Sequence, residues 1–205
     1  FCHAIPDKWY QMGVILSATD SLNWLSQISG KTASELDQLL PNEPIGPANE
    51  KFFPYLSGER TPLNDAHIRA GFSGLGQTTN LAKLTQCVME GVSFALRDCL
   101  EAIRKTDTSP NSLLAIGGGS VSQFWLQTIS NTLNIELEKP KSGEFGAALG
   151  AARLAISSII KEPIENIMSK PEIEKKIIPD QRYVNLYQTA YEKFTQGHSN
   201  LRGLQ

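Results

Sequence analysis

Three consecutive glycines carry the chemistry that this sequence most clearly suggests. The apolar run 113–116 ends in a turn with the sequence Gly117-Gly118-Gly119-Ser120, and a helical pattern begins a few residues later. Glycine has no Cβ, so a ligand can lie directly on the backbone of such a turn. The first N–H groups of the next helix are also unpaired, which favours an anion or a polar ring edge. The run is therefore either a plain tight turn or a nucleotide site; without a following Gly-Lys-Ser/Thr it is not a Walker A loop.

The remaining reactive residue types form no second cluster. The three cysteines are widely spread without a CxxC pair, and the three histidines lack metal-ligand spacing. We therefore expect no disulfide framework and no metal site within the chain. Cys99 falls on the apolar stripe of a helix, where a small buried side chain is expected rather than a reactive thiol.

Two groups of elements can be predicted around the glycine run. The first half should contain a hairpin (1–5 with 9–16), two short helices (about 20–29 and 34–40), strands at 51–55 and 71–75, and a long polar loop at 56–70. A helix over residues 80–105 has one apolar face. Gly91 in its middle should cost about 1 kcal/mol relative to alanine, so close packing against a neighbouring backbone is expected there.

The second half alternates strand and helix. We expect a strand at 112–116, a helix at 122–133, a strand from 135 to Pro140, and a helix of small residues over 146–152 that can lie close to its neighbour. This order predicts a βαβα unit and an α/β fold. Residues 161–180 should run over the surface, and the aromatic stripe of a last helix at 183–194 should pack into the core.

Composition limits the function classes. The 205 residues carry a net charge of −2 and are 40% hydrophobic, which fits one large globular domain without the basic stripe of a general nucleic-acid binder. No apolar run is long enough for a membrane span, and no secretory signal is present, so a cytoplasmic protein is expected. The chain opens at Phe1 in a strand-like run, which suggests a piece of something longer.

Several motifs together resemble the C-terminal half of a carbohydrate kinase of the FGGY family. The most diagnostic is Phe53-Pro54-Tyr55-Leu56-Ser57-Gly58-Glu59-Arg60-Thr61-Pro62. The others, in register along the chain, are 1–4 with Trp9 and Met12-Gly13, 69–75, 90–98, 117–120 and 144–152. The resemblance implies an α/β, ribonuclease-H-like domain of the actin-like ATPase superfamily, with a mixed sheet and helices on both faces. Residues 1–205 would form most of the C-terminal, nucleotide-binding domain, without the N-terminal sugar and phosphate domain.

The resemblance also implies a ligand and its contacts. ATP or ADP, with Mg²⁺, would be the cofactor, and the glycine turn would lie against the adenosine and α-phosphate. The implied nucleotide-binding residues are Gly117, Gly118, Gly119 and Ser120, with Ser122 and Gln123 near the adenine. Helix capping explains Ser122 equally well.

The catalytic residues are expected outside this chain. In the family, a base aspartate takes the proton of the sugar hydroxyl, and it lies upstream of the hairpin. Asp65 and Asp98 match no catalytic motif, so the chain alone should not phosphorylate sugar. The loop at Glu59 and Arg60 either borders the cleft between the domains or is held by local salt bridges.

The expected partners are ATP, a ketose sugar and the protein's own N-terminal domain, without nucleic acid or membrane. A homodimer is compatible with the sequence. Residues 55–60 are most similar to the xylulokinase subfamily, which implies D-xylulose as the acceptor. Gluconokinase, ribulokinase, glycerol kinase and a non-catalytic actin-like nucleotide-binding module stay open as alternatives.

Overall fold

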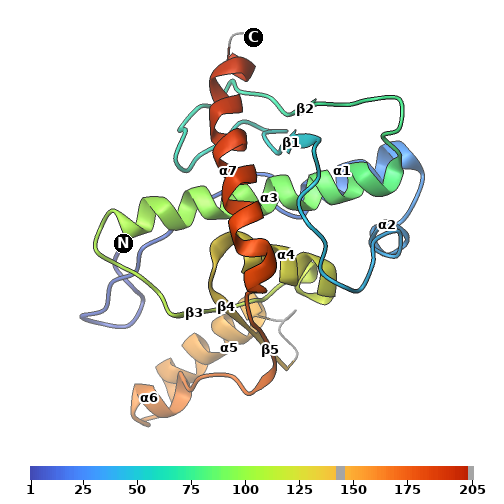
Figure 1. Cartoon of the computed structure of the whole chain (residues 1–205). Helices are drawn as coiled ribbons and strands as arrows, with labels where there is room; N and C mark the ends of the chain where they lie inside the picture. The colour runs from blue at the N-terminus through green and yellow to red at the C-terminus, as the bar shows by residue number, and fades with distance from the viewer. Residues whose placement is uncertain (142–145, 203–205) are drawn as a thin grey trace.

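Helix α3 (Leu81–Arg104) is the element on which the other elements pack (Figure 1). The Asn80 side chain accepts the N–H of Lys83 and caps its first turn, and Arg104 ends it, within one residue of the prediction. α1 (Asp20–Ser29), α2 (Ala33–Asp37), α4 (Gln123–Leu133) and α7 (Gln181–Arg202) contact it. The computed structural model describes residues 1–141 and 146–202.

A two-stranded antiparallel sheet lies against the middle of α3. β1 (Lys51–Phe53) pairs with β2 (Gly71–Ser73), with Phe52 opposite Phe72. A Cβ on Gly91 would lie 2.2 Å from the carbonyl oxygen of Phe52. The close approach predicted for Gly91 is therefore confirmed.

The second sheet has the order β3–β4–β5 and is mixed, as the resemblance implies. β3 (Ser112–Leu114) and β4 (Glu136–Pro140) are parallel and joined through α4, which confirms the expected strand–helix–strand unit. α4 packs on this sheet through contacts with β4 and β5.

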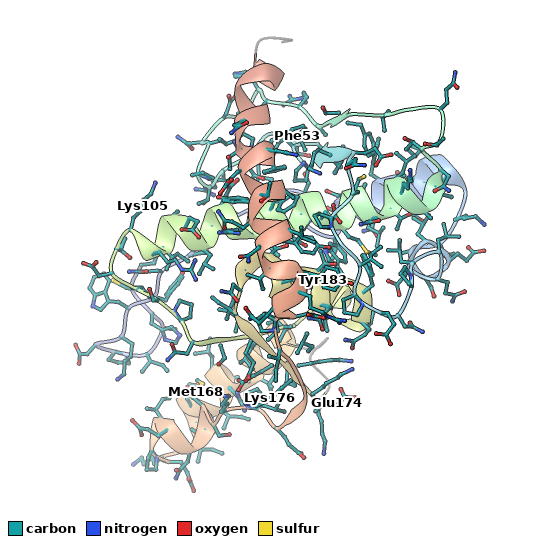
Figure 2. All side chains as sticks on the ribbon, in the orientation of Figure 1. Phe53, Lys105, Met168, Glu174, Lys176 and Tyr183 are labelled. Carbon is teal, nitrogen blue, oxygen red and sulfur yellow. The ribbon has the colours of Figure 1, made fainter. Side chains whose placement is uncertain are left out.

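β5 (Ile173–Ile177) corrects the expectation that residues 161–180 only run over the surface. The sequence did not predict this strand because most of its side chains are charged or exposed and only Ile177 is buried. They pair across the strands instead: Lys176 Nζ lies 2.7 Å from Glu136 and Glu174 lies 3.6 Å from Lys139. Figure 2 labels Glu174 and Lys176 on this edge strand. The same stretch holds the short helix α6 (Ile164–Ile167).

The last helix packs as its aromatic stripe predicted. Tyr187 and Phe194 of α7 are buried, and the Phe194 ring stacks on Phe53 with ring centres 5.1 Å apart. Figure 2 shows Phe53 beside α7. α7 thereby packs on β1 through Phe53, whereas Trp24 of α1 stacks on its neighbour Phe52.

Two other expectations hold only in part. The hairpin at the start of the chain is present but short: Cys2 and Trp9 form an antiparallel bridge, Phe1 and Tyr10 exchange both backbone hydrogen bonds, and residues 11–16 form no strand. α5 (Gly146–Ile159) buries none of its residues, and a Cβ on Gly150 would meet nothing within 4 Å; the expected close approach is found at its first residue, where a Cβ on Gly146 would lie 2.7 Å from Cδ1 of Ile116. Gly143, Glu144 and Phe145, which belong to the predicted lead into this helix, lie outside the described residues.

No helix in the described ranges has both the length and the apolar character that crossing a membrane requires.

The Gly91 contact makes a prediction about stability. Gly91→Ala should lower the free energy of unfolding by about 2 kcal/mol, because the new Cβ would overlap the Phe52 carbonyl. Gly150→Ala, the matched change in an open helical position, should raise it by up to about 1 kcal/mol. Urea titrations of both variants measure the difference, and equal effects would contradict the packing argument.

Candidate nucleotide site

The glycine run borders a cavity of about 1090 Å³. Its walls come from the apolar faces of α3 and α4, from the end of β3 and from the first residues of the chain. Val92, Leu96 and Cys99 line it from α3, and Trp125 lines it from α4. The α3 residues belong to the stripe that the sequence assigned to a core, and they were missed as lining residues because an apolar stripe looks the same in both roles.

The turn itself has an open backbone. Gly117 adopts φ +87°, which strongly favours glycine, and Gly118–Val121 form one turn of 3₁₀ helix. The Ser120 N–H and hydroxyl both donate to the Gly117 carbonyl, at 3.0 and 2.7 Å, and close the turn. Gly117, Gly118, Gly119 and Ser120 all line the cavity.

Gly118 lies at an open position of the turn. A Cβ built on Gly118 would meet no protein atom within 4 Å, and its φ is not in the left-handed region. Neither packing nor backbone conformation within the described structure therefore requires glycine there. A Cβ on Gly119 would instead lie 3.1 Å from Cγ2 of Thr19, so Thr19 forms the facing wall.

Ser122 and Gln123 do not line the cavity. The Ser122 hydroxyl caps α4 by accepting the N–H of Trp125 at 3.0 Å, and it also donates to Asp37. The Gln123 side chain accepts Lys175 Nζ at 2.7 Å. Ser122 is therefore accounted for as the cap of α4. The adenine contacts of Ser122 and Gln123 stay a prediction.

The cavity walls are nearly free of charge. Among the lining residues that the structure describes, no side chain is a carboxylate, lysine, arginine or histidine. Such a wall suits a flat, largely uncharged ring and excludes water from it. The described residues contain no group of three His, Cys, Asp or Glu side chains that could hold a metal ion, and the described lining residues offer no carboxylate to a Mg²⁺ ion carried by a nucleotide.

The acidic residues that might act as acids or bases are engaged in structure. The Asp65 carboxylate accepts the N–H groups of His67 and Ile68 and shapes the long loop. Asp98 is buried on α3 and accepts the Tyr191 hydroxyl at 2.6 Å; burial raises its pKa to about 6. Neither residue lines the cavity.

Glu90 is the most deeply buried carboxyl group, at 1% exposure. It accepts the Ala48 N–H at 3.1 Å and the Gln86 amide at 2.7 Å, and it ties the loop before β1 to α3. Burial raises its pKa to about 7, even though these donors favour the charged form. Its role is therefore in the core.

Comparison with known proteins shows the family of this chain. Residues 2–159 match the model of the FGGY family of carbohydrate kinases, C-terminal domain. The chain is 33% identical to xylulose kinase of Escherichia coli over 98% of its own length, and 34% identical to that of Staphylococcus epidermidis over 95%. Among solved structures, a xyloylose kinase from Brucella ovis covers the whole chain with a TM-score of 0.94 and 44% identity. A ligand-bound xylulose kinase from Lactobacillus acidophilus covers 89% with a TM-score of 0.72 and 26% identity.

The fold thus defines an α/β domain of the ribonuclease-H-like kind. The chain belongs to the FGGY family of carbohydrate kinases and matches its C-terminal domain. It spans 42% of the length of the Escherichia coli and Brucella ovis proteins.

The Glu90 pKa predicts how stability depends on pH. The folded state keeps the Glu90 proton between pH 4.5 and about 7, whereas the unfolded state has lost it. This contribution to stability is present below pH 4.5 and is lost as pH rises through 7, at most about 3 kcal/mol. Between these pH values the free energy of unfolding should fall more steeply for the wild type than for Glu90→Gln. Urea titrations at several pH values test this, and parallel curves would contradict it.

Proposed function

We propose that this chain is the nucleotide-binding domain of an ATP-dependent sugar kinase, and that the parent protein transfers the γ-phosphate of ATP to the 5-hydroxyl of D-xylulose. The observation that carries the proposal is the open backbone at Gly118, next to a cavity with apolar walls. Family membership supports the same role, since the matched model describes carbohydrate kinases.

In this proposal the chain's own residues bind and orient the nucleotide. The glycine turn lies against the adenosine and the α-phosphate, where Gly118 lets the ligand reach the backbone. Leu96 and Val92 of α3 form an apolar wall that keeps water from the ring. Fixing the nucleotide in this way supplies the positioning on which phosphoryl transfer depends.

In this proposal the groups that react lie outside this chain. The sugar hydroxyl attacks the γ-phosphorus, the bond from that phosphorus to the ADP oxygen breaks, and an aspartate upstream of Phe1 takes the hydroxyl proton. No charged side chain among the described lining residues could take that proton or neutralise the phosphates. The part of the parent protein upstream of Phe1 is therefore proposed to supply both functions: the base aspartate from the start of the same domain, and phosphate contacts from the N-terminal domain, which is the proposed partner.

D-xylulose is the proposed acceptor because this chain aligns over almost its whole length with the relatives named above, which are xylulose kinases. A gluconate kinase from Lactobacillus acidophilus also shares the fold, with a TM-score of 0.69 and 25% identity. The sugar would bind mainly to the missing domain, so a panel of sugars and polyols assayed with the parent protein separates these acceptors.

Gly118→Val tests the nucleotide site. A branched side chain would fill the space reserved for the ligand and should weaken ADP binding by about 100-fold or more. The fold should persist, because no protein atom lies within 4 Å of the new Cβ. Calorimetry on the parent protein measures the affinity.

Gly76→Val is the matched control for that experiment, since Gly76 is also open to within 4 Å but lies outside the cavity. It should leave ADP affinity unchanged. Equal ADP affinities for the Gly118 variant and the wild type would refute the nucleotide assignment.

The division of labour between the domains gives a second test. The 205-residue chain alone should show no ATP-dependent phosphorylation of D-xylulose, whereas the parent protein should turn over. An assay that couples ADP release to NADH oxidation measures both. Turnover by the isolated chain would refute the proposed division, and a parent that binds ADP without phosphorylating any sugar would favour the non-catalytic module.

A further inference from the structure

The loop from residue 56 to 66 is a closed structure built around Gly58. Gly58 has φ +82°, and a Cβ there would lie 2.9 Å from the Ala66 carbonyl oxygen. Glu59 and Asp65 then exchange both backbone hydrogen bonds at 2.9 Å, which closes the loop on itself. The described contacts do not include the local salt bridges that the sequence suggested for this loop. The Glu59 carboxyl group accepts backbone N–H groups instead.

Glu59 and Thr61 project from this loop onto the segment 13–17. Oε1 of Glu59 accepts the Leu16 N–H at 3.1 Å, and the Thr61 hydroxyl accepts the Val14 N–H at 3.0 Å. The Thr61 N–H donates back to the Val14 carbonyl at 2.9 Å. Loop and segment are thus joined by three hydrogen bonds, which we call the clamp.

The segment also lies directly on α3. A Cβ on Gly13 would be 2.5 Å from Cβ of Cys99, so only glycine allows this approach. Cys99 also lies under the clamp, with its Sγ 4.0 Å from the Thr61 carbonyl oxygen. The segment is therefore fixed between α3 and the loop.

The segment runs directly into the wall of the nucleotide cavity. Ala18 and Thr19 follow it and line the cavity, and Thr19 faces Gly119 across the turn. Thr19 is also the first cap residue of α1, and its carbonyl accepts the N–H groups of Leu22 and Asn23. A shift at Val14 or Leu16 would consequently move the wall that faces the glycine turn.

We propose that Glu59 and Thr61 are positioning residues that hold the Ala18–Thr19 wall at the distance from the glycine turn that the nucleotide requires. This inference rests on the proposed function, because it assumes a nucleotide in the cavity. It assigns a role to the Gly58-Glu59-Arg60 motif, which is 57 residues or more from the glycine turn in sequence.

The burial of Glu59 supports a demanding role. Its side chain is 3% exposed, and its second oxygen, Oε2, has no hydrogen-bond partner among the described residues. Burial raises the pKa of Glu59, against the lowering by the Arg60 and Leu16 N–H groups. Burying a polar side chain there costs free energy unless its oxygen accepts a hydrogen bond that the fold requires. Removing that acceptor would leave the Leu16 N–H unpaired.

The test distinguishes the effect of the hydrogen-bond acceptor at Glu59 from the effect of its negative charge. In the parent protein, Glu59→Met and Thr61→Val each remove one acceptor at nearly constant volume, and each should weaken ADP binding by about tenfold. Glu59→Gln keeps Oε1 and should stay within about twofold of the wild type. The KM for ATP should rise in the first two variants, while the KM for the sugar stays unchanged.

Asn131→Ala provides the matched structural control. Asn131 is equally buried, and its side-chain oxygen accepts the Asp180 N–H at 2.8 Å, but it does not line the cavity. It should lower stability without changing ADP affinity. If Glu59→Met does not fold, Thr61→Val decides the test alone.

The failures of the two proposals are distinguishable. Wild-type ADP affinity in Thr61→Val, together with loss of binding in Gly118→Val, would overturn the clamp and leave the proposed function intact. A wild-type parent protein that binds no ADP would overturn the proposed function itself.

Discussion

The structure depends on how closely α3 approaches the backbone of β1. Gly91 lets the helix axis come so near that the Phe52 carbonyl occupies the place of a side chain. The small two-stranded sheet is thereby fixed on one side of α3, and the apolar side chains Val92 and Leu96 are left to face the cavity. A larger residue at position 91 would move α3 away from β1, and would so shift both the small sheet and the apolar wall of the cavity. The absence of a side chain at position 91 thus connects the packing of the core with the position of the cavity wall.

Buried polar groups hold the long connections around this helix. Glu90 ties the loop before β1 to α3, and Asp98 with Tyr191 ties α7 to it. Each carboxyl group has a raised pKa because burial disfavours its charge. Such groups look like candidate acids and bases when only the titration is considered. Their positions away from the cavity show that they serve the fold.

The candidate site is assembled from distant parts of the chain. The glycine turn supplies an open backbone, α3 supplies an apolar wall, and the segment before α1 supplies Thr19. The clamp from Glu59 and Thr61 connects that segment to a loop that itself lies outside the cavity lining. The wall that faces the glycine turn is therefore connected to the loop by hydrogen bonds to the backbone at Val14 and Leu16.

The sequence alone determined the local elements and the family. Periodicity and capping residues located α3 and α4, because these depend on neighbours a few residues apart, and the glycine run was found because three adjacent glycines are a local pattern. Tertiary structure decided the rest. β5 was hidden, since its edge position allows charged side chains, and Ser122 proved to be a helix cap. The roles of Leu96, Thr19 and Glu59 depend on contacts between residues far apart in the chain, which no local pattern contains.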